Sequence, residues 1–222
     1  MKPAHDIYKC PNCKGLIVRL SFMSANNFGE CLFSDGKRIA PMLPNIPTLV
    51  KCEKCNNFIW LYKIKEIETR AGFFDFKNSE CTDYVKFLTI EDNFKVLSLR
   101  IAESKDDIKY VRKQILWAYN DRKRESLNMF NDEDDEENWI RNCKELLCLL
   151  DPIDADEKIM MAEINRYLGN FDEAIKIIKS SKKVYNWLKE KFLLECESKN
   201  QSVFQLYGEI DYFKEKRIEF LI

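Results

Sequence analysis

The stretch Cys10-Pro11-Asn12-Cys13, with its later counterpart Cys52-Glu53-Lys54-Cys55, decides how the N-terminal part of this 222-residue chain folds. Each Cys-x-x-Cys pair turns the chain back so that both sulfurs face one point, and four thiolates suit a tetrahedral Zn²⁺ ion. The sequence therefore predicts one structural zinc held by Cys10, Cys13, Cys52 and Cys55. The same ligands suit a rubredoxin-type iron, so zinc and iron both stay open.

Apolar, β-branched residues follow both pairs and predict strands over 16–22 and 58–64. A further short strand is expected at 30–33, before a turn at 34–37. A knuckle followed by a strand, twice, is the layout of a zinc ribbon with rubredoxin-like knuckles. We expect Gly15 and Asn56 to take the left-handed backbone position that such turns need after the second cysteine.

From residue 89 onward the apolar residues recur at helical spacing. Thr89 with Asp92, and Asp154 with Glu157, have the spacing of capping boxes and predict two helix starts. We expect helices within 89–198, with an acidic solvated loop at 131–138 whose last acids favour the next helix.

These patterns predict an α+β protein in which a small β zinc ribbon precedes an α-helical, TPR-like domain. The expected boundaries are a ribbon over 1–67, a linker over 68–88 that packs on something, and a helical domain over 89–222. Residues 1–65 hold ten Lys and Arg against four Asp and Glu, whereas the remainder holds 26 against 33. This asymmetry indicates either an anionic partner for the ribbon or docking of the two halves on each other.

Cysteine usage and hydropathy favour the cytoplasm. The chain has nine cysteines, an odd number, and four of them have metal-type spacing. A reducing compartment is therefore expected rather than a disulfide scaffold. No apolar run is long enough for a membrane span, and residues 1–6 have no apolar core of a secretory signal.

No catalytic constellation stands out, so we predict no catalytic residue and no cofactor besides zinc. His5 is the only histidine, and we interpret it as a mobile terminal residue rather than a further ligand. Cys31 and Cys81 are interpreted as plain thiols because no histidine is available to activate them. An enzyme acting through carboxylates between the halves is the weakest alternative.

Two groups of residues are candidates for partner binding. The first comprises basic and aromatic residues of the ribbon that would suit nucleic acid. In the alternative interpretation, the aromatic residues fill a small core and the basic residues face solvent. These residues are Lys37, Arg38, Lys51, Lys54, Phe28, Phe33 and Trp60. The second is Trp117, Tyr119 and the segment 120–124, which suits either a partner-binding helix end or basic residues that offset the helix dipole.

The segment 162–175 resembles one tetratricopeptide (TPR) unit, with Gly169, Phe171 and Ala174 matching the turn and second helix. Solenoids normally need about three repeats, so flanking helices are expected to complete the packing. The whole chain resembles a group of uncharacterised bacterial proteins that join an N-terminal zinc ribbon to a TPR-like helical tail. That resemblance rests on the paired knuckles and on the segments 28–29, 34–37, 41–44 and 168–174, and it implies a fold more than an activity.

The leading interpretation is thus a non-enzymatic, cytoplasmic zinc-binding protein whose helical domain binds another protein. The alternative is a nucleic-acid-binding zinc-ribbon protein.

Overall fold

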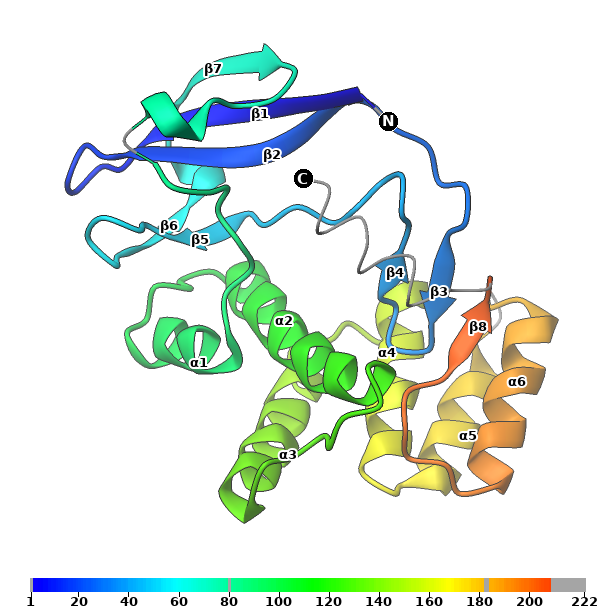
Figure 1. The fold of residues 1–222 in the computed structure, drawn as a ribbon. Coiled ribbons are helices and arrows are strands. Elements are labelled where there is room, and N and C mark those ends of the chain that lie inside the picture. The colour runs from blue at the N-terminus through cyan, green and yellow to red at the C-terminus, as the bar shows by residue number, and fades with distance from the viewer. Residues whose placement is uncertain (1, 80, 182–183, 209–222) are drawn as a thin grey trace.

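The computed structural model describes residues 2–79, 81–181 and 184–208, and within them the architecture is mixed α+β (Figure 1). Six α-helices follow the N-terminal strands in this described part: α1 (Ile90–Ser98), α2 (Lys105–Arg124), α3 (Glu133–Leu147), α4 (Ala155–Tyr167), α5 (Phe171–Ser180) and α6 (Asn186–Glu197). The predicted order of a β region before a helical region is confirmed. No α-helix among these residues is long and apolar enough to cross a membrane.

The strands form three small sheets among the described residues. β1 (Lys2–Lys9) lies between β2 (Leu16–Ser24) and β7 (Glu66–Ala71), and both pairings are antiparallel. β5 (Leu49–Lys51) pairs with β6 (Phe58–Trp60). β3 (Cys31–Phe33) lies between β4 (Arg38–Ile39) and β8 (Gln205–Tyr207). The strand expected over 58–64 is therefore shorter than predicted, because a 3₁₀ turn, η1, takes Leu61–Lys63.

The helical part begins where the sequence indicates. Thr89 and Asp154 are N-caps whose side chains accept hydrogen bonds from the backbone N–H groups of Asp92 and Glu157, which satisfies donors that have no partner inside the helix. The acidic segment 131–138 differs from the expectation of a loop, since α3 already begins at Glu133. Asp132 caps that helix, and carboxylates in a first turn are favoured by the helix dipole.

The ribbon and the helices share a hydrophobic core. Leu49 of β5 and Trp60 of β6 lie in one buried cluster with residues of α1 to α4, and the Trp60 indole donates to the Ile101 carbonyl at 3.1 Å. Strand β8, which follows α6, pairs with β3 of the N-terminal part. The two predicted parts are therefore docked on each other. This docking is one of the two explanations offered above for the charge asymmetry.

The segment 68–88, predicted as a linker, packs along the β1–β2 sheet. Its first residues belong to β7, a strand that the sequence did not predict, and further on it contains a short 3₁₀ turn, η2 (Phe76–Asn78). The Val85 N–H then donates to the Val18 carbonyl of β2 at 2.9 Å, and the Cys81 thiol donates to the Leu16 carbonyl at 3.0 Å.

The expectation for His5 is wrong. His5 lies inside β1, is buried, and packs edge-on against Phe74 with 5.0 Å between ring centroids. β1 pairs with β2 on one side and with β7 on the other, so residues 2–9 are held inside a sheet. No local feature of the polar residues 1–6 indicates this. Of the unassigned tail, residues 205–207 form β8, and 209–222 lie outside the described residues.

Candidate metal centre and helical groove

The two Cys-x-x-Cys pairs form the tips of two β-hairpins. Lys9 faces Leu16 across the first hairpin, and Lys51 faces Phe58 across the second. In the first tip the Cys10 N–H donates to the Gly15 carbonyl at 2.9 Å, and the Lys14 N–H donates to the Cys10 carbonyl at 3.0 Å. In the second tip the Cys52 N–H donates to the Asn57 carbonyl at 2.9 Å, and the Asn56 N–H donates to the Cys52 carbonyl at 2.8 Å. Equivalent backbone bonds give both pairs the same shape.

The residue directly after each second cysteine takes the left-handed backbone conformation. These residues are Lys14, with φ +61°, and Asn56, with φ +58°. The prediction for Asn56 is confirmed and that for Gly15 is wrong. Gly15 has a different reason to lack a side chain: a Cβ there would lie 3.0 Å from the Lys54 side chain and 3.4 Å from the Cys13 sulfur. The two knuckles therefore approach each other closely at Gly15.

The four sulfurs converge on one point. The Sγ atoms of Cys10 and Cys55 are 3.6 Å apart, as are those of Cys13 and Cys52, and all four lie within 4.8 Å of one another. A tetrahedron with Zn–S bonds of about 2.3 Å has sulfur–sulfur edges of about 3.8 Å. The separations fit a four-coordinate ion, so the structure brings together the predicted ligand set.

The local electrostatics differ among the thiols of the metal-free chain. Burial raises the pKa of Cys52 to about 12, whereas the backbone N–H of Asn57, together with its side-chain amide 3.3 Å from the sulfur, lowers the pKa of Cys55 to about 6. A bound cation favours the thiolate at every ligand, because only the deprotonated sulfur coordinates. Metal binding therefore has to release protons, most of all from the buried Cys52.

The cluster sits on a small apolar core. Cys10 and Cys52 are buried, and they pack with the following residues of the two hairpins and η1: Tyr8, Ile17, Val50, Ile59 and Leu61. Cys13 and Cys55 are half-buried. With four protein ligands, a tetrahedral ion keeps no position for a substrate or water, which is typical of a structural site.

The cysteines outside the cluster lie in different environments. The Cys31 thiol donates to the Tyr207 carbonyl at 3.1 Å, and Cys81 bonds Leu16 as described above. Cys143 is buried in α3, where burial raises the pKa of its thiol, while Cys148 at the end of that helix is exposed.

The basic residues considered for nucleic acid are largely paired with acids. Lys37 pairs with Asp121, and Arg38 with Glu30 at 2.8 Å. The Lys51 ammonium lies 3.1 Å from the Asp92 carboxylate. Of the three aromatic candidates, Phe33 and Trp60 are buried, whereas Phe28 is 76% exposed.

The C-terminal end of α2 binds the chain itself. The Trp117 indole donates to the Asp35 carbonyl at 3.0 Å, Asn120 donates to the Asp35 carboxylate at 2.8 Å, and Arg124 forms an ion pair with the same carboxylate. Asp35 belongs to the turn predicted at 34–37. Sequence reasoning flagged both segments but missed that they are partners, because they lie more than 80 positions apart.

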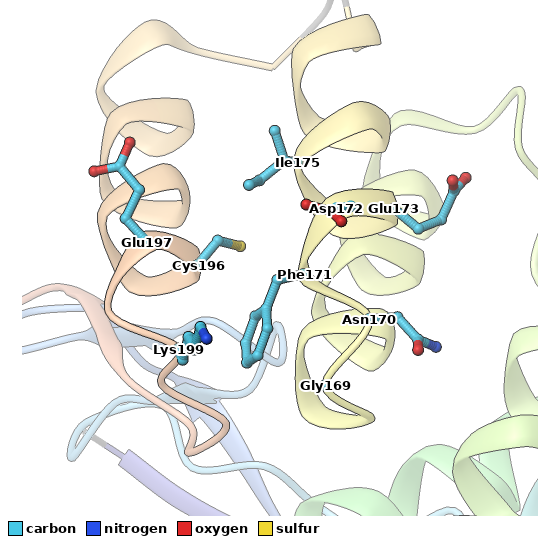
Figure 2. Close-up of a pocket in the computed structure, with 9 residues that line it drawn as sticks. All are labelled: Gly169, Asn170, Phe171, Asp172, Glu173, Ile175, Cys196, Glu197 and Lys199. Carbon is cyan, nitrogen blue, oxygen red and sulfur yellow. The ribbon is translucent and has the colours of Figure 1, made fainter.

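The helical hairpin of α4 and α5 turns at Gly169, whose φ is +77°, and Ala174 is buried where the helices meet. Between α5 and α6 lies an open groove of about 830 Å³. Figure 2 shows Ile175 and Cys196 pointing toward each other from the two helices, with Phe171 below them. Sequence reasoning identified Phe171 only as part of the TPR-like turn.

Comparison with known proteins adds no assignment: no family model, no curated protein and no solved structure matches the chain.

Proposed function

We propose that this chain is a non-enzymatic zinc-binding protein, in which one structural Zn²⁺ fixes the two N-terminal hairpins and the helical region binds another protein. The observation that carries the metal assignment is the convergence of four cysteine sulfurs within 4.8 Å. When bound, zinc links the two hairpin tips as a structural cross-link. The buried lone histidine, His5, supports a role without general acid–base chemistry.

A native mass spectrum of the full chain, purified without added metal, tests the metal assignment. We expect one zinc per chain, and loss of that mass in a Cys52→Ser variant but not in the matched Cys148→Ser variant. An iron mass with rubredoxin-like visible absorption would instead select the other metal. A chain that takes up neither metal would overturn the proposal.

The groove between α5 and α6 supports the protein-binding part. Its lining combines the apolar side chains of Phe171, Ile175 and Cys196 with four charged residues, Asp172, Glu173, Glu197 and Lys199. Paired helices with such grooves receive peptide segments in other proteins. On the outer surface of α6, Leu194 is 63% exposed. These features are the reason to seek a partner here rather than at the ribbon.

Site-specific photo-crosslinking in the native host tests this groove. A photoreactive amino acid at Phe171 should give one dominant crosslinked protein, and the same group at Ile153, which is 87% exposed away from the groove, should not. Ile175→Glu should remove the crosslink by placing a charge in the groove. Identical crosslinks from both positions would contradict groove-specific binding.

Nucleic acid is the alternative partner. The carboxylates beside Lys37, Arg38 and Lys51 would compete with phosphate groups for these side chains, so the acids found there favour the protein-binding proposal. RNA or DNA affinity that falls steeply with salt would reverse this preference.

A further inference from the structure

The sheet β2-β1-β7 has one border that is covered over part of its length and one open border within the described residues. At the β2 border, the segment 81–85 bonds to the carbonyls of Leu16 and Val18. At the other border, all six residues of β7 are exposed, and Figure 1 shows no element beyond this strand. An open edge strand presents unpaired backbone donors and acceptors to another strand.

The backbone groups of β7 that face outward follow from its pairing with β1. The Gly72 N–H donates to the Pro3 carbonyl at 3.0 Å, and Arg70 and Glu68 face His5 and Ile7 in the register. Because neighbouring residues of a strand alternate in direction, the N–H and C=O groups of 68, 70 and 72 point to β1, and those of 69 and 71 point outward. The register shift near Glu66 interrupts this alternation, so the usable edge is centred on Thr69.

We propose that β7 pairs antiparallel with β7 of a second copy of this chain, with Thr69 opposite Thr69 of that copy. In this register each Glu68 lies opposite an Arg70, and the outward-facing groups of both strands meet. A shift by one residue would oppose outward-facing groups to inward-facing ones. A shift by two residues would place Glu68 opposite Glu68, or Arg70 opposite Arg70, and like charges in directly opposed positions destabilise a sheet.

The charges of the edge suit this symmetric contact. Within one chain the Arg70 guanidinium lies 2.6 Å from the Glu68 carboxylate, and both side chains are exposed. Pairing around a two-fold axis places two Glu68–Arg70 pairs side by side, so that negative and positive side chains alternate across the contact. It also joins two three-stranded sheets into one continuous sheet. The edge is short, so the dimer is weak and concentration-dependent.

Sedimentation velocity of the full chain, from micromolar to millimolar concentration, tests the proposal. We expect a monomer–dimer equilibrium whose dissociation constant rises about tenfold in Arg70→Glu and in Glu68→Arg. The double variant E68R/R70E exchanges the two charges and should restore the original constant, because residues 68 and 70 still carry opposite charges across the axis.

Lys65→Glu is the matched control, since it changes the net charge as Arg70→Glu does but lies outside β7; it should leave dimerisation unchanged. Circular dichroism checks that every variant folds. A chain that stays monomeric at the highest concentration would overturn the proposal. So would a dimer that is insensitive to the single reversals, or one that the double variant fails to restore.

Discussion

Replacement of Asp35 by Asn should destabilise the protein more than its position in a four-residue turn suggests. The Asp35 side chain is 0% exposed, and that of its ion-pair partner Arg124 is 2% exposed. The same carboxylate accepts hydrogen bonds from Asn120 and from the Lys37 N–H. Burial disfavours the Arg124 guanidinium, yet the carboxylates of Asp35 and Asp121 raise its pKa above the ordinary value, so the arginine stays charged.

The expected magnitude follows from what Asp35→Asn leaves behind. Removing one partner of a buried ion pair costs about 3–5 kcal/mol, because the other charge stays buried without compensation. Arg124 keeps Asp121 at 2.6 Å, so we expect the lower end, about 3 kcal/mol. For a chain of this size that corresponds to a fall of about 6–12 °C in melting temperature.

Urea and thermal denaturation, followed by circular dichroism at saturating zinc, measure the effect. Glu103→Gln is the control, because Glu103 pairs with Lys63 at 3.2 Å on the surface and such pairs contribute about 1 kcal/mol or less. The double variant D35L/R124L should be less destabilised than Arg124→Leu alone, since it leaves no unpaired buried charge. If Asp35→Asn unfolds no earlier than Glu103→Gln, the inference that this buried ion pair stabilises the protein is wrong.

Further predictions concern the metal centre and the first sheet. Cys52→Ser should abolish zinc binding and also lower the melting temperature of the helices, because Leu49 and Trp60 of the second hairpin lie in the core shared with α1 to α4, whereas Cys148→Ser, at an exposed position, should change neither; metal analysis and thermal far-UV circular dichroism would contradict this if the helices melt at the same temperature without the metal. Gly15→Ala should weaken zinc affinity slightly in a chelator competition, because its Cβ would lie 3.0 Å from the Lys54 side chain and 3.4 Å from the Cys13 sulfur; unchanged affinity would show that the Lys54 side chain simply moves aside. Burial opposes ionisation of Asp6, but hydrogen bonds led by Arg19 lower its pKa below the ordinary value. Ionised Asp6 therefore contributes stability that is lost as the pH falls below about 4, and Asp6→Asn should flatten this acid limb in denaturation curves measured across pH; an equally steep limb would refute the assignment.

Local sequence was sufficient wherever a feature depends on a few neighbouring residues. The Cys-x-x-Cys spacing predicts all four members of the cysteine cluster, because two cysteines three positions apart can face one point only through a tight turn. The caps Thr89 and Asp154 are equally local, since an N-cap side chain bonds a backbone group three residues ahead. The left-handed residue of the first knuckle was misplaced at Gly15, because glycine also serves close packing, and only the fold shows which role applies.

Features that depend on contacts between distant segments were decided by the tertiary structure. His5 has no local signal for burial, and its position follows from two strands that pair on either side of it. Strand β8 pairs with β3 although more than 170 positions separate them, and Asp35 finds Arg124 from across the chain. Local sequence determined the cysteine cluster and the helix starts, because both depend on backbone turns a few residues long. Only the folded chain decided how the ribbon is fixed to the helices and which sheet border stays open, because those outcomes depend on which distant surfaces bury each other.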